Sequence, residues 1–155
     1  MNYRTPKFEN YGWGNSIKII KNKITAKGHN LVNYDPKETV LRYEDKILGM
    51  DVEIELLFTM KSHKLYNIFL RCNKIAILHP ILEILNSKYG EYTRKDNLSF
   101  IWELGDYSIV LIGRLSGHKE DVQLYYTSSF LQGLQNTENI ESAERKFSVK
   151  EVRRF

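Results

Sequence analysis

The sequence is poor in the residues that define several protein classes. Cys72 is the single cysteine among 155 residues, which excludes an internal disulfide and favours a reducing compartment. No stretch approaches the roughly 20 apolar residues of a membrane-spanning helix. Residues 1–7 also lack the apolar core of a signal peptide. We therefore expect a cytoplasmic protein with no membrane partner.

The sequence also lacks the common signatures of catalysis and metal binding. Its four histidines show no HxxH or HxxxH spacing, so neither a metal site nor a cofactor is predicted. Gly12-x-Gly14 has no third glycine and no preceding strand, so it does not predict a phosphate-binding loop. Cys72 has no predicted base beside it and is expected to be a small core residue. No catalytic residue is assigned.

The charge is only mildly basic, at +4 with a pI near 9.0. Its one local cluster comprises Arg145, Lys146, Lys150, Arg153 and Arg154 near the end of the sequence. Lysines and arginines that contact phosphates release counterions, so this tail keeps nucleic-acid binding open as an alternative function. The simpler interpretation is a solvated chain end.

Periodicity predicts two successive sets of elements. In the first set, Ile17, Ile20 and Ile24 share one helical face, and Ser16 and Gly28 have the properties of its N-cap and its end. The predicted elements are a helix over 16–27 and strands over 39–48, 51–58 and 65–71, then a helix over 80–89 and strands over 98–104, 107–114 and 122–127. A last helix begins at Ser128 or Ser129.

The two sets follow the same order, with Tyr43 corresponding to Trp102. We expect an α+β protein in which two similar units, each a helix plus an antiparallel β-meander, form one compact domain over 1–155. The predicted pseudo-repeats cover about 13–71 and 76–128, and a C-terminal helix and basic tail cover 129–155. This order predicts an internal duplication.

Short motifs carry a resemblance to a group of small bacterial proteins of unknown activity. The motifs are Trp13-Gly14-x-Ser16, Leu41-x-Tyr43-Glu44-Asp45-Lys46 followed by Gly49, a strand ending in Phe58 before Leu65, Lys88-Tyr89-Gly90, and Tyr126-Thr127-Ser128. More distantly, each unit resembles the repeat of β-lactamase inhibitor protein and of the small lipoprotein of outer-membrane β-barrel assembly. The resemblance implies a non-catalytic binding protein. Asn15 replaces the usual methionine, and the lipoprotein cysteine is absent.

Two other features have simple structural interpretations. Asp51, Glu53 and Glu55 alternate with apolar residues, and we expect a solvated strand face balanced by lysine or arginine on the next strand, rather than a Mg²⁺ or acid–base site. Trp13 is expected to pack at the start of the first helix. Neither feature predicts a functional site.

The strands of the second meander are apolar on both faces, and such strands are normally covered on both sides. We expect the last helix, with Phe130, Leu131 and Leu134, to cover the second face. The alternative is an interface lined by Ile101, Val110, Ile112 and Tyr125, with Arg114 and Gln123 at its polar rim. The preferred function is non-enzymatic protein binding, through a separate partner or self-association. Small-molecule binding or enzymatic activity is a third option.

Overall fold

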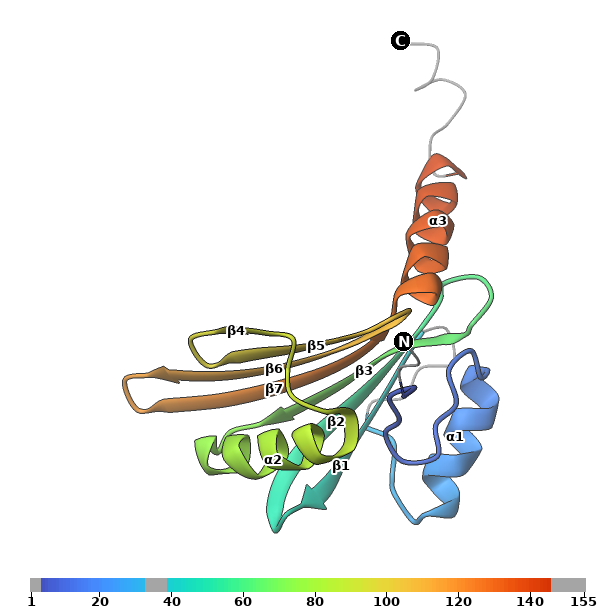
Figure 1. Cartoon of the computed structure of the whole chain (residues 1–155). Helices are drawn as coiled ribbons and strands as arrows, with labels where there is room; N and C mark the ends of the chain where they lie inside the picture. The colour runs from blue at the N-terminus through green and yellow to red at the C-terminus, as the bar shows by residue number, and fades with distance from the viewer. Residues whose placement is uncertain (1–3, 33–38, 146–155) are drawn as a thin grey trace.

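The chain folds around a seven-stranded antiparallel sheet that has two helices against one face and a third helix rising on the other side (Figure 1). The computed structural model describes residues 4–32 and 39–145, with side chains as far as Glu141. The strand order is β1-β2-β3-β7-β6-β5-β4. This arrangement confirms the expected α+β class with two helix-plus-meander units. Within the described ranges, no helix combines the length and apolar character needed to cross a membrane.

The first unit matches its predicted elements closely. It consists of α1 (Ile17–Ala26), β1 (Val40–Ile47), β2 (Met50–Phe58) and β3 (Leu65–Cys72). The Ser16 hydroxyl accepts a hydrogen bond from the Ile19 N–H at 3.3 Å and caps α1 as expected. Gly28 follows the helix at φ 85°, a conformation that glycine adopts without strain. Ile20 and Ile24 of α1 are completely buried in the core.

The second unit contains one strand that the pattern did not predict. It consists of a 3₁₀ turn η1 (Ile75–Ile77), α2 (Leu78–Tyr89), β4 (Arg94–Asp96), β5 (Ser99–Leu104), β6 (Tyr107–Ser116) and β7 (Lys119–Ser128). The three residues of β4 are charged and exposed, so no apolar alternation marks them. α2 begins two residues before the expected start, and Pro80 still lies in its first turn.

The two units join where β3 pairs with β7, with Leu70 directly opposite Leu124. Every paired strand in the sheet is antiparallel, as the two-meander prediction requires. Both units contribute to the core between the sheet and the helices. The duplication of one ancestral unit stays a prediction.

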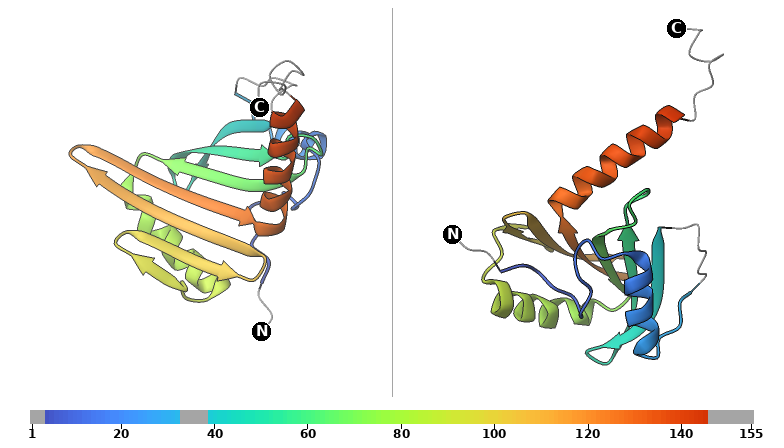
Figure 2. Two further views of the ribbon diagram at one scale, coloured as in Figure 1. Left: turned by 90° about the horizontal axis from the view of Figure 1, so that it is seen from above. Right: turned by 90° about the vertical axis from the view of Figure 1, so that its right-hand side faces the viewer.

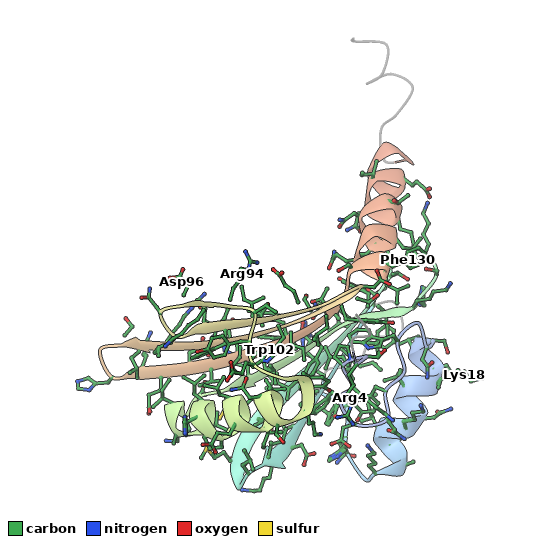
Figure 3. The ribbon with its side chains drawn as sticks, viewed as in Figure 1. Arg4, Lys18, Arg94, Asp96, Trp102 and Phe130 are labelled. Carbon is green, nitrogen blue, oxygen red and sulfur yellow. The ribbon has the colours of Figure 1, made fainter. Side chains whose placement is uncertain are left out.

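In the second unit, the core lies between the sheet and α2 (Figure 3). Trp102 is fully buried there, and its indole N–H donates a hydrogen bond to the Gly90 carbonyl at 2.9 Å. A Cβ at Gly113 of β6 would lie 2.6 Å from a methyl group of Leu78, so any larger residue there would force the Leu78 side chain to move. Cys72 is a buried core residue, as predicted.

The last helix, α3 (Ser129–Arg145), does not cover the second meander as expected. It contacts β3 and β7, and it rises away from the sheet instead of lying along β5 and β6 (Figure 2). The Glu138 carboxylate accepts hydrogen bonds from the backbone N–H groups of Lys61 and Ser62 and from the Ser62 hydroxyl, which ties α3 to the β2–β3 turn. Phe130 is consequently 77% exposed.

Candidate functional site

The face of the sheet opposite α1 and α2, called the outer face below, carries a row of apolar side chains. Phe69, Tyr125, Val110 and Ile101 come from β3, β7, β6 and β5, and each is directly opposite the next in the strand register. Ile112 follows Val110 on the same face, and all five side chains are partly exposed. The structure therefore brings the four predicted apolar interface residues together on one surface.

An aromatic pair marks the junction of the two units on this face. The rings of Phe69 and Tyr125 are stacked, with centroids 4.6 Å apart and an interplanar angle of 19°. The Tyr125 hydroxyl donates a hydrogen bond to Gln123 at 2.7 Å, and the Gln123 amide donates to Asp121 at 2.8 Å. Gln123 thus places an amide next to the apolar row, and its role at the rim of an interface stays a prediction.

Phe69 was not among the predicted residues of this surface. It lies between Ile68 and Leu70, which are both buried on the helix side. Three consecutive apolar residues in a strand indicate that both faces carry apolar groups, so the signal was present.

Ion pairs border the apolar row at both ends. Arg94 and Glu103 are 3.0 Å apart beyond Ile101, and Arg42 and Glu55 are 3.2 Å apart beyond Phe69. Arg94 projects from the sheet on the side away from α2 (Figure 3). Arg114 is exposed opposite Asp121, whose carboxylate pairs with Arg71 at 3.0 Å. The outer face therefore has an apolar centre and a charged rim.

The acidic stripe on β2 is a solvated face, as predicted. Asp51 pairs with Lys46 at 3.2 Å and Glu55 pairs with Arg42, both across the β1–β2 register. Across residues 4–32 and 39–141, no three or more His, Cys, Asp or Glu side chains are grouped to hold a metal ion. The turns that contain His63 and His118 lie at opposite ends of the β3–β7 pair.

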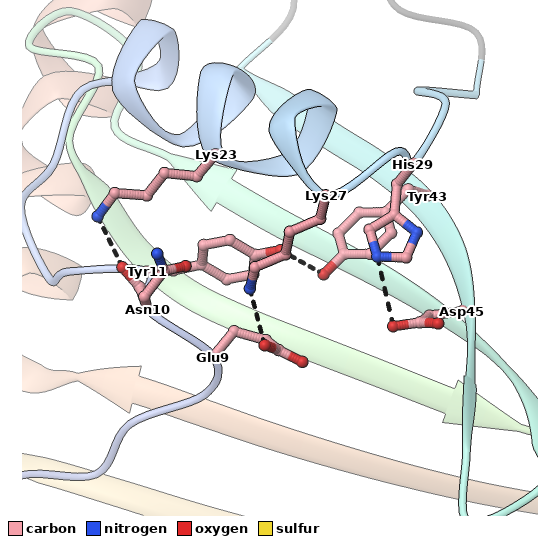
Figure 4. Close-up of polar contacts among 8 residues, drawn as sticks. All are labelled: Glu9, Asn10, Tyr11, Lys23, Lys27, His29, Tyr43 and Asp45. Atoms are coloured by element: carbon pink, nitrogen blue, oxygen red, sulfur yellow. Dashed lines mark hydrogen bonds and ion pairs between the residues drawn. The ribbon is translucent and has the colours of Figure 1, made fainter.

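A second polar cluster joins the N-terminal segment, α1 and β1 (Figure 4). The hydroxyls of Tyr11 and Tyr43 are 2.6 Å apart, and burial raises the pKa of both phenols. The Lys27 ammonium is 2.8 Å from the Glu9 carboxylate and lies 5.1 Å from the centroid of the Tyr11 ring. Because both phenols remain protonated, neither serves as a base at neutral pH. This cluster fastens the N-terminal segment to the first unit.

Trp13 also fastens this segment, as expected for a residue at the start of α1. Its indole N–H donates to the Pro6 carbonyl at 2.9 Å, and its ring contacts Tyr107 with centroids 5.6 Å apart. The contact with Tyr107 reaches across to β6 of the second unit. Trp13 is therefore a packing residue that links the two units.

The predicted basic tail lies mostly outside the described residues. Lys146, Lys150, Arg153 and Arg154 are not described, and Arg145 is the last residue of α3 with an undescribed side chain. The nucleic-acid alternative therefore stays a prediction.

Comparison with known proteins identifies no relative. Neither a protein-family model, nor a curated protein, nor a solved structure matches this chain. The resemblance to small bacterial proteins of unknown activity, and the more distant one to repeats of binding proteins, therefore stay predictions from the motifs.

Proposed function

We propose that this chain is a non-enzymatic protein-binding module that contacts a separate partner protein through its outer face. One observation carries the proposal: a continuous apolar row crosses four strands on a face that α1 and α2 do not cover. Strands with apolar side chains on both faces are normally covered on both sides. A partner protein supplies the missing cover.

The chemistry of the outer face fits a protein surface. Its centre combines aromatic and branched aliphatic groups, and its rim carries ion pairs and the Gln123 amide, which is the usual anatomy of a protein interface. Tyr125 is held by its hydrogen bond to Gln123, so little side-chain entropy is lost on contact. The resemblance to repeats of binding proteins favours a separate partner over a second copy. The single cysteine favours the cytoplasm as the place of binding.

Site-specific photo-crosslinking in the source cell tests the proposal. A photoreactive residue replaces Ile112 on the outer face, and a matched one replaces Lys18 on the outer side of α1. We expect one protein, identified by mass spectrometry, to be crosslinked from position 112 and not from position 18. Val110→Asp in the position-112 protein should abolish the crosslink, because an ionised carboxylate resists burial in an apolar contact.

Circular dichroism of Val110→Asp separates lost binding from lost folding. Since Val110 is partly exposed, this variant should keep the spectrum of the parent protein. If it unfolds, Val110→Thr provides a milder change of nearly the same shape. A crosslink only to a second copy of the chain would contradict the separate partner. Equal crosslinking from positions 112 and 18 would contradict the site.

A further inference from the structure

On the helix side of the sheet, a cavity of about 600 Å³ lies between α2, the N-terminal segment and the β1–β2 turn. Leu70 and Leu124, which face each other at the β3–β7 junction, line it together with Ile81 and Leu85 of α2. This volume lies within the range of roughly 300–1,000 Å³ typical of small-molecule sites. The cavity lies where the two units meet, on the side opposite the proposed protein-binding face.

The cavity has one apolar end. Ile47 at the end of β1 and Leu48 in the β1–β2 turn line it there, and Ile47 and Ile81 also line a small adjoining void. Leu48 is 50% exposed, and Ile84 of α2, which also lines the cavity, is 42% exposed. Two large apolar side chains with this much exposed surface beside one cavity indicate a place for an apolar group.

The other end of the cavity is basic. Arg4 donates a hydrogen bond to the Lys88 carbonyl at 3.2 Å, and the Lys7 backbone N–H donates to the Tyr89 hydroxyl at 3.0 Å, so these residues are held together. Of the described residues that line the cavity, Glu9 is the one acid, and it is paired with Lys27. Among the described residues, the ammonium groups of Lys7 and Lys88 have no acidic partner. This end therefore carries an excess of positive charge.

A tyrosine hydroxyl that has no hydrogen-bond partner among the described residues faces the cavity at the same basic end. Tyr126 is 5% exposed and lines the cavity, yet its hydroxyl makes no hydrogen bond within the described part of the chain. Its ring lies 6.1 Å from that of Phe8, which places it beside the segment that carries Lys7. A phenol hydroxyl that faces a cavity without a protein partner is free to donate a hydrogen bond to a ligand. Burial raises the pKa of Tyr126, so the phenol remains a donor at neutral pH.

We infer that this cavity binds a small carboxylate with an apolar body. The carboxylate lies between Arg4, Lys7 and Lys88 and accepts the hydrogen bond of the Tyr126 hydroxyl. The apolar body lies over Leu70 and Leu124 and extends toward the β1–β2 turn. Charge-assisted hydrogen bonds at one end and apolar burial at the other then select an amphiphile of negative charge.

Titration of the full chain with matched probes tests this inference. Decanoate, decanol and decyltrimethylammonium share one apolar chain and differ in the charge of the head. Binding is measured from the amide signals of Lys7, Tyr89 and Leu124 in ¹H–¹⁵N spectra. We expect decanoate to bind at least about tenfold more tightly than decanol, and the cation to bind more weakly than either. Equal affinity for decanoate and the cation would overturn the inference.

Variants locate the binding. The double variant Lys7→Gln/Lys88→Gln should weaken decanoate binding about tenfold, and Tyr126→Phe should weaken it severalfold while leaving the ring in place. Lys18→Gln/Lys119→Gln removes the same charge from exposed positions that do not line the cavity, and should leave the affinity unchanged. Equal effects of the two double variants would show that only the overall charge matters.

Two further experiments test whether decanoate binds inside the cavity and whether the basic end binds a membrane surface instead. Ile84→Trp changes a partly exposed residue and fills the cavity, so decanoate binding should be lost while the folded spectrum remains. Sedimentation with phosphatidylglycerol vesicles tests whether the basic end recognises a membrane surface instead. Vesicle binding that requires Lys7 and Lys88, without decanoate binding, would overturn the small-molecule site. Failure of this site would leave the outer-face proposal untouched, because the two lie on opposite faces.

Discussion

The two units share one order of elements but differ on the outer face of the sheet. In the first unit this face carries Asp51, Glu53 and Glu55, and cross-strand cations balance two of the three. In the second unit the equivalent strands carry Val110 and Ile112. The helix side must be apolar in both units because it forms the core. The outer face has no such constraint, so its apolar row in the second unit supports the proposal that this surface binds a partner.

The helices differ as well. Ile20 and Ile24 of α1 are completely buried, whereas α2 leaves Ile84 42% exposed and a cavity beside it. Tyr43 and Trp102 are both fully buried, but Tyr43 is bonded to Tyr11 of the N-terminal segment and Trp102 to the end of its own helix. The N-terminal segment thus covers the core of the first unit and leaves a cavity beside α2 of the second unit.

The largest expected effect tests this contrast between the helices. Ile24→Ala should lower the free energy of unfolding by about 2–5 kcal/mol, because it creates a cavity in a closed core. Ile84→Ala in α2 should lower it by less than about 1 kcal/mol, since the side chain is already partly hydrated. Urea denaturation of both variants measures the difference. Similar losses of unfolding free energy in the two variants would mean that α2 is packed against the core as closely as α1.

A smaller effect is expected from the hydrogen bonds that attach α3 to the first unit and not to the second meander. Glu138→Ala should destabilise the attachment of α3 by about 1–3 kcal/mol, because three donors of the β2–β3 turn lose a charged acceptor. Amide hydrogen exchange in α3 and at Ser62 measures the loss. Unchanged exchange in α3 would show that Leu131 and its neighbours hold the helix without the carboxylate.

The same attachment should depend on pH. Burial raises the pKa of Glu138, but the hydrogen bonds from Ser62 and Lys61 outweigh it and leave the pKa below its ordinary value. A lowered carboxyl pKa stabilises the folded form above the unfolded pKa, and this stabilisation is lost as the pH falls through the folded pKa. The protection factors of the α3 amides, which are corrected for the slower intrinsic exchange in acid, should therefore fall as the pH is lowered, and Glu138→Ala should remove this dependence.

The smallest expected effect concerns the solvated face of the first unit. Lys46→Ala removes the pair with Asp51, in which both side chains are largely exposed, and should change the free energy of unfolding by less than about 1 kcal/mol. It should also leave the crosslink from position 112 intact. Loss of that crosslink would extend the binding surface onto β1 and β2.

The elements with strong local signals could be predicted from the sequence. Ser16 and Gly28 delimit α1 because a hydroxyl cap and a left-handed glycine act within one turn. β4 lacked any signal, because three charged residues at a sheet edge pair only through their backbone. The place of α3 was predicted wrongly, because an apolar helix face does not indicate which distant surface it contacts.

Local order was thus determined by the sequence itself: two helix-plus-meander units, their turns, and an apolar second face on the later strands. The tertiary structure alone decided how these parts meet. Pairing of β3 with β7 placed Phe69 beside Tyr125 and Leu70 beside Leu124, residues more than fifty positions apart. Glu138 accepts hydrogen bonds from a turn more than seventy positions away and attaches α3 there. Such contacts depend on shape and burial summed over the whole chain, which no local pattern contains.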